Sequence, residues 1–166
     1  MKKILFLLVA ISSFASDVKV YKHINEMTDE VMYLASYGVA VKNYDRGLGF
    51  AIKPYIDNNI KFTGLMVSQV GFGCNENDNL ILLLENGQKI NLTSWNKFNC
   101  EGDSYFRVNQ GILYKLKNSP LKKAMFRNGR NYKSLTQEFE QFDKDYFIKV
   151  ISIVEGRGFT KYEEGN

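Results

Sequence analysis

The chain has 166 residues, of which 14% are aromatic and only two are proline, and its formal net charge is +4. This length suits one domain with one hydrophobic core. Without Lys2 and Lys3, which lie in a segment that we expect to be removed, the charge is about +2, too small to indicate nucleic-acid binding by itself. The aromatic-rich, proline-poor composition favours a β-rich domain.

The first fifteen residues have the features of a secretory signal peptide. Two lysines precede a short apolar run, and small residues follow at Ser13 and Ala15, so we expect cleavage after Ala15. The apolar run is well below the roughly 20 residues that a membrane-spanning helix needs, and no second long apolar run follows. The sequence therefore predicts an exported protein, periplasmic or secreted, with no transmembrane segment in the mature chain.

Residues 16–155 are expected to form a single β-rich domain, followed by a polar tail at 156–166. The predicted strands of the first half are residues 17–23, 31–42, 48–53 and 60–70. The second of these is ambiguous because Thr28 can cap a helix there, but its β-branched and aromatic residues favour a strand. We expect Pro54 to end the third strand, and Gly64 is a candidate for a bulge in the fourth.

The strongest local signal is a hairpin over residues 79–93. Asn86-Gly87 separates two strand-like runs, and this dipeptide favours a two-residue turn of type I′. Such a turn would place Leu83 opposite Ile90 and make one face of the hairpin wholly apolar.

The only two cysteines, Cys74 and Cys100, flank this hairpin. In an exported chain two cysteines indicate one disulfide. The hairpin register sets Cys74 opposite Asn99, one residue short of Cys100, so we expect a bulge or a loosened strand end that lets the sulfurs meet.

Two helices are expected after the hairpin. Asn109 can cap a short helix over residues 110–117. Ser134 begins a capping-box pattern, which predicts a second helix over residues 134–142.

The remaining predicted strands are residues 104–108, 121–127 and 146–154. The last of these is apolar on both faces, which indicates a buried central strand. Many short strands with few helices are typical of an antiparallel β-sandwich or a partly open barrel. The fold class that we expect is therefore mainly β, with two short helices at its ends or edges.

Met27-Thr28-Asp29-Glu30, followed by Tyr33-Leu34-Ala35-Ser36, resembles an N-terminal pattern of small exported bacterial β-proteins. This group includes the VasI-type accessory proteins of type VI secretion, and the order of the predicted elements is also similar. The group tends to carry a cysteine after the third strand, where this chain has Lys53-Pro54. The resemblance covers about half of the chain and implies a periplasmic β-sandwich without an established catalytic site.

Few residues indicate catalysis. The chain has one histidine, His23, and no G-x-S-x-G or H-E-x-x-H motif, which argues against nucleophilic catalysis and a zinc site. Residues 75–79 resemble a calcium loop but lack its glycine and distal glutamate. Glu101 and Asp103 are a candidate acid–base pair, although carboxylates in turns are usually solvated. We expect no catalytic residue, no cofactor and no metal.

The charge distribution is uneven, because residues 104–137 contain eight basic side chains and no acidic one. The candidate contacts to an acidic protein or an anionic envelope component are Lys122, Lys123, Arg127 and Arg130. On a straight strand, however, these side chains would not all share one face. The alternative is a solvated surface, partly matched by the acidic residues that follow.

The single tryptophan, Trp95, is close in sequence to Tyr105 and Phe106. Aromatic residues of this kind can mark a partner-binding patch, but a lone tryptophan in a small domain is more often core, and we expect it there.

The sequence favours an exported, non-enzymatic binding or accessory protein of the cell envelope. An inhibitor or immunity protein that blocks an envelope-degrading enzyme stays open as an alternative, and so does a phage-encoded envelope protein. Nucleic acid is not an expected partner.

Overall fold

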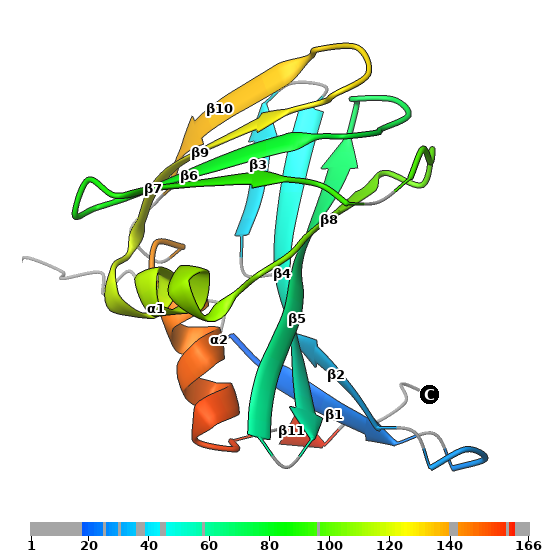
Figure 1. The fold of residues 1–166 in the computed structure, drawn as a ribbon, viewed down its shortest axis with the longest axis vertical. Coiled ribbons are helices and arrows are strands. Elements are labelled where there is room, and N and C mark those ends of the chain that lie inside the picture. The colour runs from blue at the N-terminus through cyan, green and yellow to red at the C-terminus, as the bar shows by residue number, and fades with distance from the viewer. Residues whose placement is uncertain are drawn as a thin grey trace, which may run out of the picture.

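The structure is a computed structural model (Figure 1). It describes residues 18–24, 26–29, 31–35, 39–43, 46–57, 59–95, 97–139, 143–158 and 160–161. The predicted signal peptide, residues 1–15, lies outside the described residues. Within them the chain forms a mainly β fold with two helices, as the sequence predicts.

Three sheets make up the described β structure. The first has the strand order β10-β9-β6-β7 and consists of β6 (Asn79–Leu84), β7 (Lys89–Thr93), β9 (Leu121–Arg127) and β10 (Ser134–Glu138). The second has the order β3-β4-β5-β8 and consists of β3 (Val39–Asn43), β4 (Arg46–Asp57), β5 (Asn59–Val70) and β8 (Asp103–Phe106). The third has the order β11-β1-β2 and consists of β1 (Val20–Ile24), β2 (Val31–Ala35) and β11 (Thr160–Lys161).

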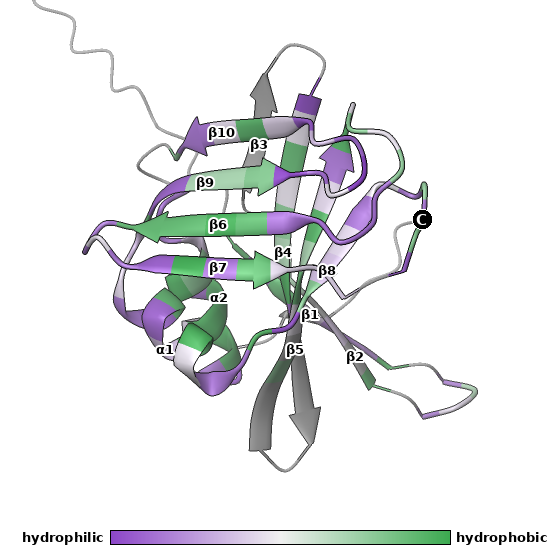
Figure 2. Cartoon of the chain, turned by 45° about the horizontal axis from the view of Figure 1, so that its top comes forward, coloured by the Kyte–Doolittle hydropathy of each residue, from purple (hydrophilic) through white to green (hydrophobic). Residues whose placement is uncertain are grey.

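The first two sheets pack face to face and enclose the core. Their strands cross at a steep angle, as Figures 1 and 2 show, and both sheets are antiparallel throughout. The large side chains with no exposed surface come from both sheets and include Phe50, Leu65, Leu82 and Phe126. This arrangement is the predicted β-sandwich.

Two contacts join the sheets at their margins. At one margin Ser94 pairs with Phe106, and the Trp95 backbone N–H donates to the Tyr105 carbonyl at 3.0 Å. At the other, Arg46 Nη1 donates to the Ser134 carbonyl at 3.1 Å. The sandwich therefore approaches a partly closed barrel.

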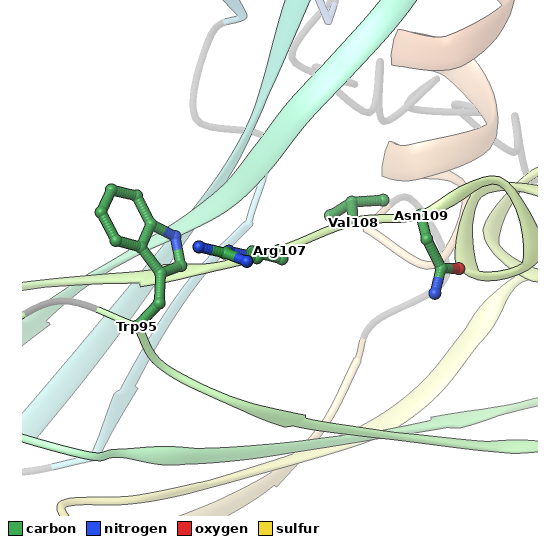
Figure 3. Close-up of a pocket in the computed structure, with 4 residues that line it drawn as sticks. All are labelled: Trp95, Arg107, Val108 and Asn109. Atoms are coloured by element: carbon green, nitrogen blue, oxygen red, sulfur yellow. The ribbon is translucent and has the colours of Figure 1, made fainter.

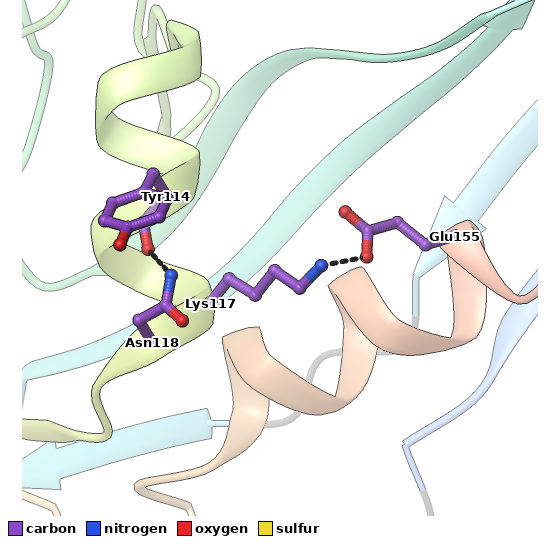
Figure 4. Close-up of polar contacts among 4 residues, drawn as sticks. All are labelled: Tyr114, Lys117, Asn118 and Glu155. Carbon is purple, nitrogen blue, oxygen red and sulfur yellow. Dashed lines mark hydrogen bonds and ion pairs between the residues drawn. The ribbon is translucent and has the colours of Figure 1, made fainter.

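The helices α1 (Gln110–Asn118) and α2 (Tyr146–Glu155) pack against each other at one end of the sandwich (Figure 1). Asn109 Oδ1 accepts a hydrogen bond from the Ile112 N–H at 2.9 Å, which confirms the predicted cap of α1. An ion pair between Lys117 and Glu155 links the two helices, and Asn118 Nδ2 donates to the Tyr114 carbonyl at 2.7 Å (Figure 4).

The hairpin exists where the sequence predicts it, but the predicted register is wrong by one residue. Leu82, not Leu83, pairs with Ile90. The Gly87 N–H donates to the Leu84 carbonyl at 3.0 Å, and Gly87 has a φ of 84°. The loop therefore contains three residues with glycine in the left-handed position, instead of a two-residue type I′ turn. In this register the even-numbered leucines of β6 enter the core together with Ile90 and Leu92 of β7, and β6 is hydrophobic along most of its length in Figure 2.

Two predicted elements have the opposite secondary structure. Ser134 begins β10, not a helix, and pairs with Arg127, because the edge of β9 offers backbone partners and only Leu135 of this segment is buried. Residues 146–154 form α2, not a central strand. A helix that is buried on several sides has a continuous run of apolar residues in its sequence, and so has a central strand. The spacing of the hydrophobic residues therefore cannot distinguish the two.

Two strand predictions of the first half are only partly right. Strand is right over helix for residues 31–35 and 39–43, but they form two strands in different sheets, β2 beside β1 and β3 beside β4, instead of the one strand predicted over residues 31–42. However, β4 continues through Pro54 to Asp57. The register with β5 shifts between Lys53 and Pro54, directly opposite Gly64, so a bulge accommodates a residue that has no N–H to donate.

Candidate functional site

A disulfide joins two loops at one end of the first sheet. Cys74 and Cys100 are bonded, with Cα atoms 4.0 Å apart, which confirms the predicted pairing. Beside it, Asn75 and Asn99 exchange two backbone hydrogen bonds of 2.8 and 3.1 Å. These residues pair in a different register from the β6–β7 ladder, so the loosened strand end that the sequence predicts is present. The disulfide therefore holds residues 97–100 against the loop that precedes β6.

A buried carboxylate supports this loop. Asp78 has no exposed surface, and its Oδ2 atom accepts hydrogen bonds from Ser104 Oγ at 2.5 Å and Asn75 Nδ2 at 3.1 Å. Its Oδ1 atom accepts a bond from the Gly129 N–H at 2.9 Å. Protein donors surround the Asp78 carboxylate, so both of its oxygen atoms are already engaged within the fold. Among the described residues no group of acidic, histidine or cysteine side chains is arranged to hold a metal ion.

The turn between β9 and β10 is fixed to the same loop. Asn128 is buried, accepts a bond from the Arg130 N–H at 2.9 Å and donates to the Cys74 carbonyl at 3.1 Å. A Cβ atom at Gly129 would lie 2.2 Å from the Glu76 carbonyl oxygen, so only glycine permits this approach. The disulfide loop and the turn are thus held as one rigid unit.

Exposed aromatic rings with stacked arginines lie on this unit. Phe98 is 49% exposed, and the Arg130 guanidinium lies 4.7 Å from its ring centre. Tyr132 is 67% exposed, with the Arg127 guanidinium at 5.0 Å. We refer to these four residues as the arginine–aromatic surface. The sequence predicts its two arginines as contact residues but gives no signal for their aromatic partners, which come together only through the disulfide and the turn.

The two predicted lysines lie farther along β9. A register shift makes Lys122 an extra residue in this strand, because Leu83 pairs with Lys123 and Leu84 pairs with Leu121. The bulge leaves Lys122 exposed and Lys123 partly exposed, while Leu121 remains buried. The four predicted residues therefore follow the outer side of β9 into the turn, which a straight strand would not allow.

An acidic side chain faces one of these lysines. Lys123 Nζ lies 2.8 Å from Glu138 Oε1. The hydrogen bond from Lys123 and its positive charge lower the pKa of the exposed Glu138 carboxyl, and Lys122 and Lys144 add smaller attractions. Part of the basic stretch is therefore neutralised by β10.

A second candidate site lies at the margin where β7 meets β8. A cleft of about 440 Å³ is lined by Trp95, Arg107, Val108 and Asn109. Trp95 is 58% exposed, so the prediction that it belongs to the core is wrong. Ser94 takes the inward position in its place and its hydroxyl accepts a bond from the Asp78 N–H at 2.8 Å.

The rings and cations around this cleft come from three elements. The Trp95 and Tyr105 ring centres lie 6.0 Å apart, and Lys53 Nζ lies 4.9 Å from the Tyr105 ring centre. Figure 3 shows the Arg107 guanidinium extending toward Trp95, with Val108 and Asn109 nearer to α1. No local pattern separates Arg107 from the other basic residues of 104–137, although alternation in the predicted strand indicates that Tyr105 and Arg107 share a face.

The candidate catalytic side chains are not assembled into a site. His23 lies on β1, the middle strand of the three-stranded sheet. Asp103 Oδ1 accepts a hydrogen bond of 2.5 Å from Ser68 Oγ across the β5–β8 ladder, while Glu101 is exposed in the preceding turn. Asp103 is thus part of the sheet structure, and the structure offers no support for the acid–base hypothesis.

Comparisons of the chain with protein-family models, curated proteins and solved structures give no match. Among the described residues no helix is both long enough and apolar enough to cross a bilayer.

Proposed function

We propose that the protein is an exported, non-enzymatic binding protein of the cell envelope that contacts an acidic protein partner through its arginine–aromatic surface. The observation that carries this proposal is the pairing of two exposed rings, Phe98 and Tyr132, with two arginines on one rigid unit. Export rests on the predicted signal peptide and agrees with the disulfide.

The composition of this surface supports protein binding. Arginine and aromatic residues are enriched at the centres of protein interfaces, where they contribute most of the binding free energy. The positive charge favours a partner with acidic side chains and speeds association with it. An exported protein with such a surface suits an accessory role in an envelope assembly.

The rigidity of the surface is the second support. The disulfide, the Asp78 carboxylate and the Asn128 amide join the loop and the turn that carry the rings. Preorganisation of this kind lowers the conformational entropy lost on binding. A stapled loop also suits an inhibitor that enters the cleft of an envelope-degrading enzyme, so inhibition is our second candidate function.

The test is affinity capture from an envelope extract, with three baits compared. Phe98→Ala combined with Arg130→Ser should lose the partner that the wild type retains. Tyr114→Ala is the matched control, because Tyr114 is a comparably exposed ring, 71% exposed, on α1. Capture of the same protein by all three baits would exclude this surface as the contact.

The identity of the retained partner then separates the two functions. A hydrolase that loses activity when the protein is added indicates an inhibitor. A partner without enzymatic activity, or an enzyme whose activity is unchanged, indicates an accessory protein.

A further inference from the structure

The cleft between Trp95 and Arg107 presents hydrogen-bond donors that have no partner within the described residues. The Arg107 side chain makes no ion pair or hydrogen bond there, and neither does the indole N–H of Trp95. Asn109 Oδ1 accepts the hydrogen bond that caps α1, and the two Nδ2 hydrogens of Asn109 are further donors.

The polar side chains that line this cleft among the described residues therefore offer mainly donors and one positive charge, and their one acceptor atom, Asn109 Oδ1, is already engaged by the cap of α1. An ionised carboxylate or phosphate has only acceptor atoms, and a guanidinium binds such groups with two parallel hydrogen bonds. Among the described residues no acidic side chain lines the cleft. The charged part of a matching ligand is consequently an anion.

The apolar part of the cleft sets a second requirement. The exposed indole of Trp95 offers an apolar face with a polar edge, and the partly buried Val108 adds aliphatic surface. A volume of about 440 Å³ lies in the range of small-molecule sites and suits one or two ring-sized units. The C–H face of a sugar ring provides a flat apolar surface for an indole and leaves the hydroxyls free for water.

We propose that this cleft binds a sugar that carries an acidic group, with the anion on Arg107 and the sugar ring on Trp95. Acidic sugars occur in envelope polysaccharides, as uronic-type carboxylates or as sugar phosphates, and both present the same chemistry to Arg107. The site shares no residue with the arginine–aromatic surface, so it is a separate binding function.

The test uses Trp95 as the reporter, because it is the only tryptophan of the chain. The emission of the purified mature protein is titrated with glucuronate, glucose 1-phosphate, glucose, acetate and inorganic phosphate. We expect a saturable change with one or both acidic sugars, and about tenfold weaker binding of glucose and of the free anions, because each lacks one of the two contacts. Which acidic sugar binds more tightly identifies the source of the anion.

Arg107→Gln should weaken the acidic sugar about tenfold and leave glucose unchanged. Arg107→Lys retains the charge without the two-pronged contact and should give an intermediate affinity. Arg130→Gln is the matched control, and the double variant Phe98→Ala, Arg130→Ser should titrate like the wild type even if it loses its protein partner.

Three results would overturn the proposal. The first is no saturable change with either acidic sugar, and the second is equal affinity for glucose. The third is an affinity of Arg107→Gln, with an unchanged far-UV circular dichroism spectrum, that equals that of the wild type.

Discussion

At the scale of single residues, Asp78 joins segments that are far apart in the sequence. Its carboxylate accepts hydrogen bonds from β8, from the disulfide loop and from the turn after β9. Burial of a carboxylate is costly unless donors surround it, and here donors do so. The Ser104 hydroxyl and the Gly129 N–H depend on this side chain, whereas Asn75 Nδ2 also donates to the Asp103 carbonyl at 2.9 Å.

We predict that Asp78→Ala lowers the free energy of unfolding by about 2 kcal/mol or more, because the buried Ser104 hydroxyl and the partly buried Gly129 N–H lose this acceptor and each unsatisfied group costs about 1–3 kcal/mol. Urea unfolding followed by circular dichroism measures this. Asn79→Ala, at the exposed neighbouring position, should change the value by about 0.5 kcal/mol or less. A loss for Asp78→Ala no larger than that of the control would show that water replaces the network.

The pair between Lys123 and Glu138 gives a second prediction at this scale. Since Lys123 lowers the pKa of the Glu138 carboxyl, the pair contributes to stability above the pKa of the unfolded chain, and the contribution is lost as the pH falls through the lower folded value. We expect Lys123→Gln to raise the Glu138 pKa in an NMR titration of side-chain carboxyl carbons. An unchanged pKa would mean that the pair does not form in solution.

At the scale of elements, sequence patterns identify strands and turns better than they identify register. The hairpin follows from Asn86-Gly87, but its loop length depends on packing, because only the observed register places Ile90 and Leu92 of β7 on the same inward face as the even-numbered leucines of β6. Similarly, Ser134 has a helix-start pattern, yet the free edge of β9 makes the segment a strand.

The sequence predicts those parts of the candidate sites that residue type alone identifies, and not those that depend on contacts between distant segments. The cysteines and the basic residues of β9 are recognisable by residue type alone. The stacking of Arg130 on Phe98 and the cleft at Trp95 depend on contacts between residues distant in sequence, which no local pattern contains. The bulge at Lys122 also arises from such a contact, namely the pairing of β9 with β6.

The disulfide supports a prediction for the loop elements. It closes a loop with a sequence separation of 26 residues, so the chain-entropy model gives a stabilisation of about 3.5 kcal/mol. We expect the double variant Cys74→Ser, Cys100→Ser to unfold at a lower urea concentration by a corresponding amount. Reduced wild-type protein is the control and should match the variant. Mass spectrometry that finds two free thiols in natively exported protein would contradict the bond itself.

At the scale of the whole molecule, the two ends of the sandwich differ in character. One end is closed by α1 and α2, and the other end carries the disulfide loop and the arginine–aromatic surface (Figure 1). The basic residues of β9 extend from the end that the helices close toward the end that carries the disulfide loop. Long-range attraction to an anionic surface should therefore act on one side of the molecule.

We predict that replacing Lys122, Lys123, Arg127 and Arg130 by Ser weakens binding to anionic liposomes and reduces its salt dependence. Exposed charges are screened over a Debye length of about 8 Å at physiological salt. The matched control removes four positive charges elsewhere, namely Lys19, Lys89, Lys115 and Lys149. If both folded variants bind alike at low and moderate salt, net charge and not position governs the attraction.

Export itself is open to a direct measurement. We predict that protein recovered from a periplasmic fraction begins near Ser16, within about two residues of the expected cleavage after Ala15. N-terminal sequencing tests this. An intact Met1 in that fraction, or recovery from the cytosol alone, would contradict the prediction.

The contacts at the two margins of the first sheet bear on self-association. An open strand edge is a template on which another chain can add and begin an aggregate. Here β7 and β10 are five residues each, the Trp95 N–H beyond β7 is bonded to β8, and the Ser134 carbonyl of β10 is occupied by Arg46. Because these contacts close the sandwich, only a short stretch of backbone at each edge of this sheet is left for a second copy to pair with. The stretch on β7 begins at the exposed, charged Lys89.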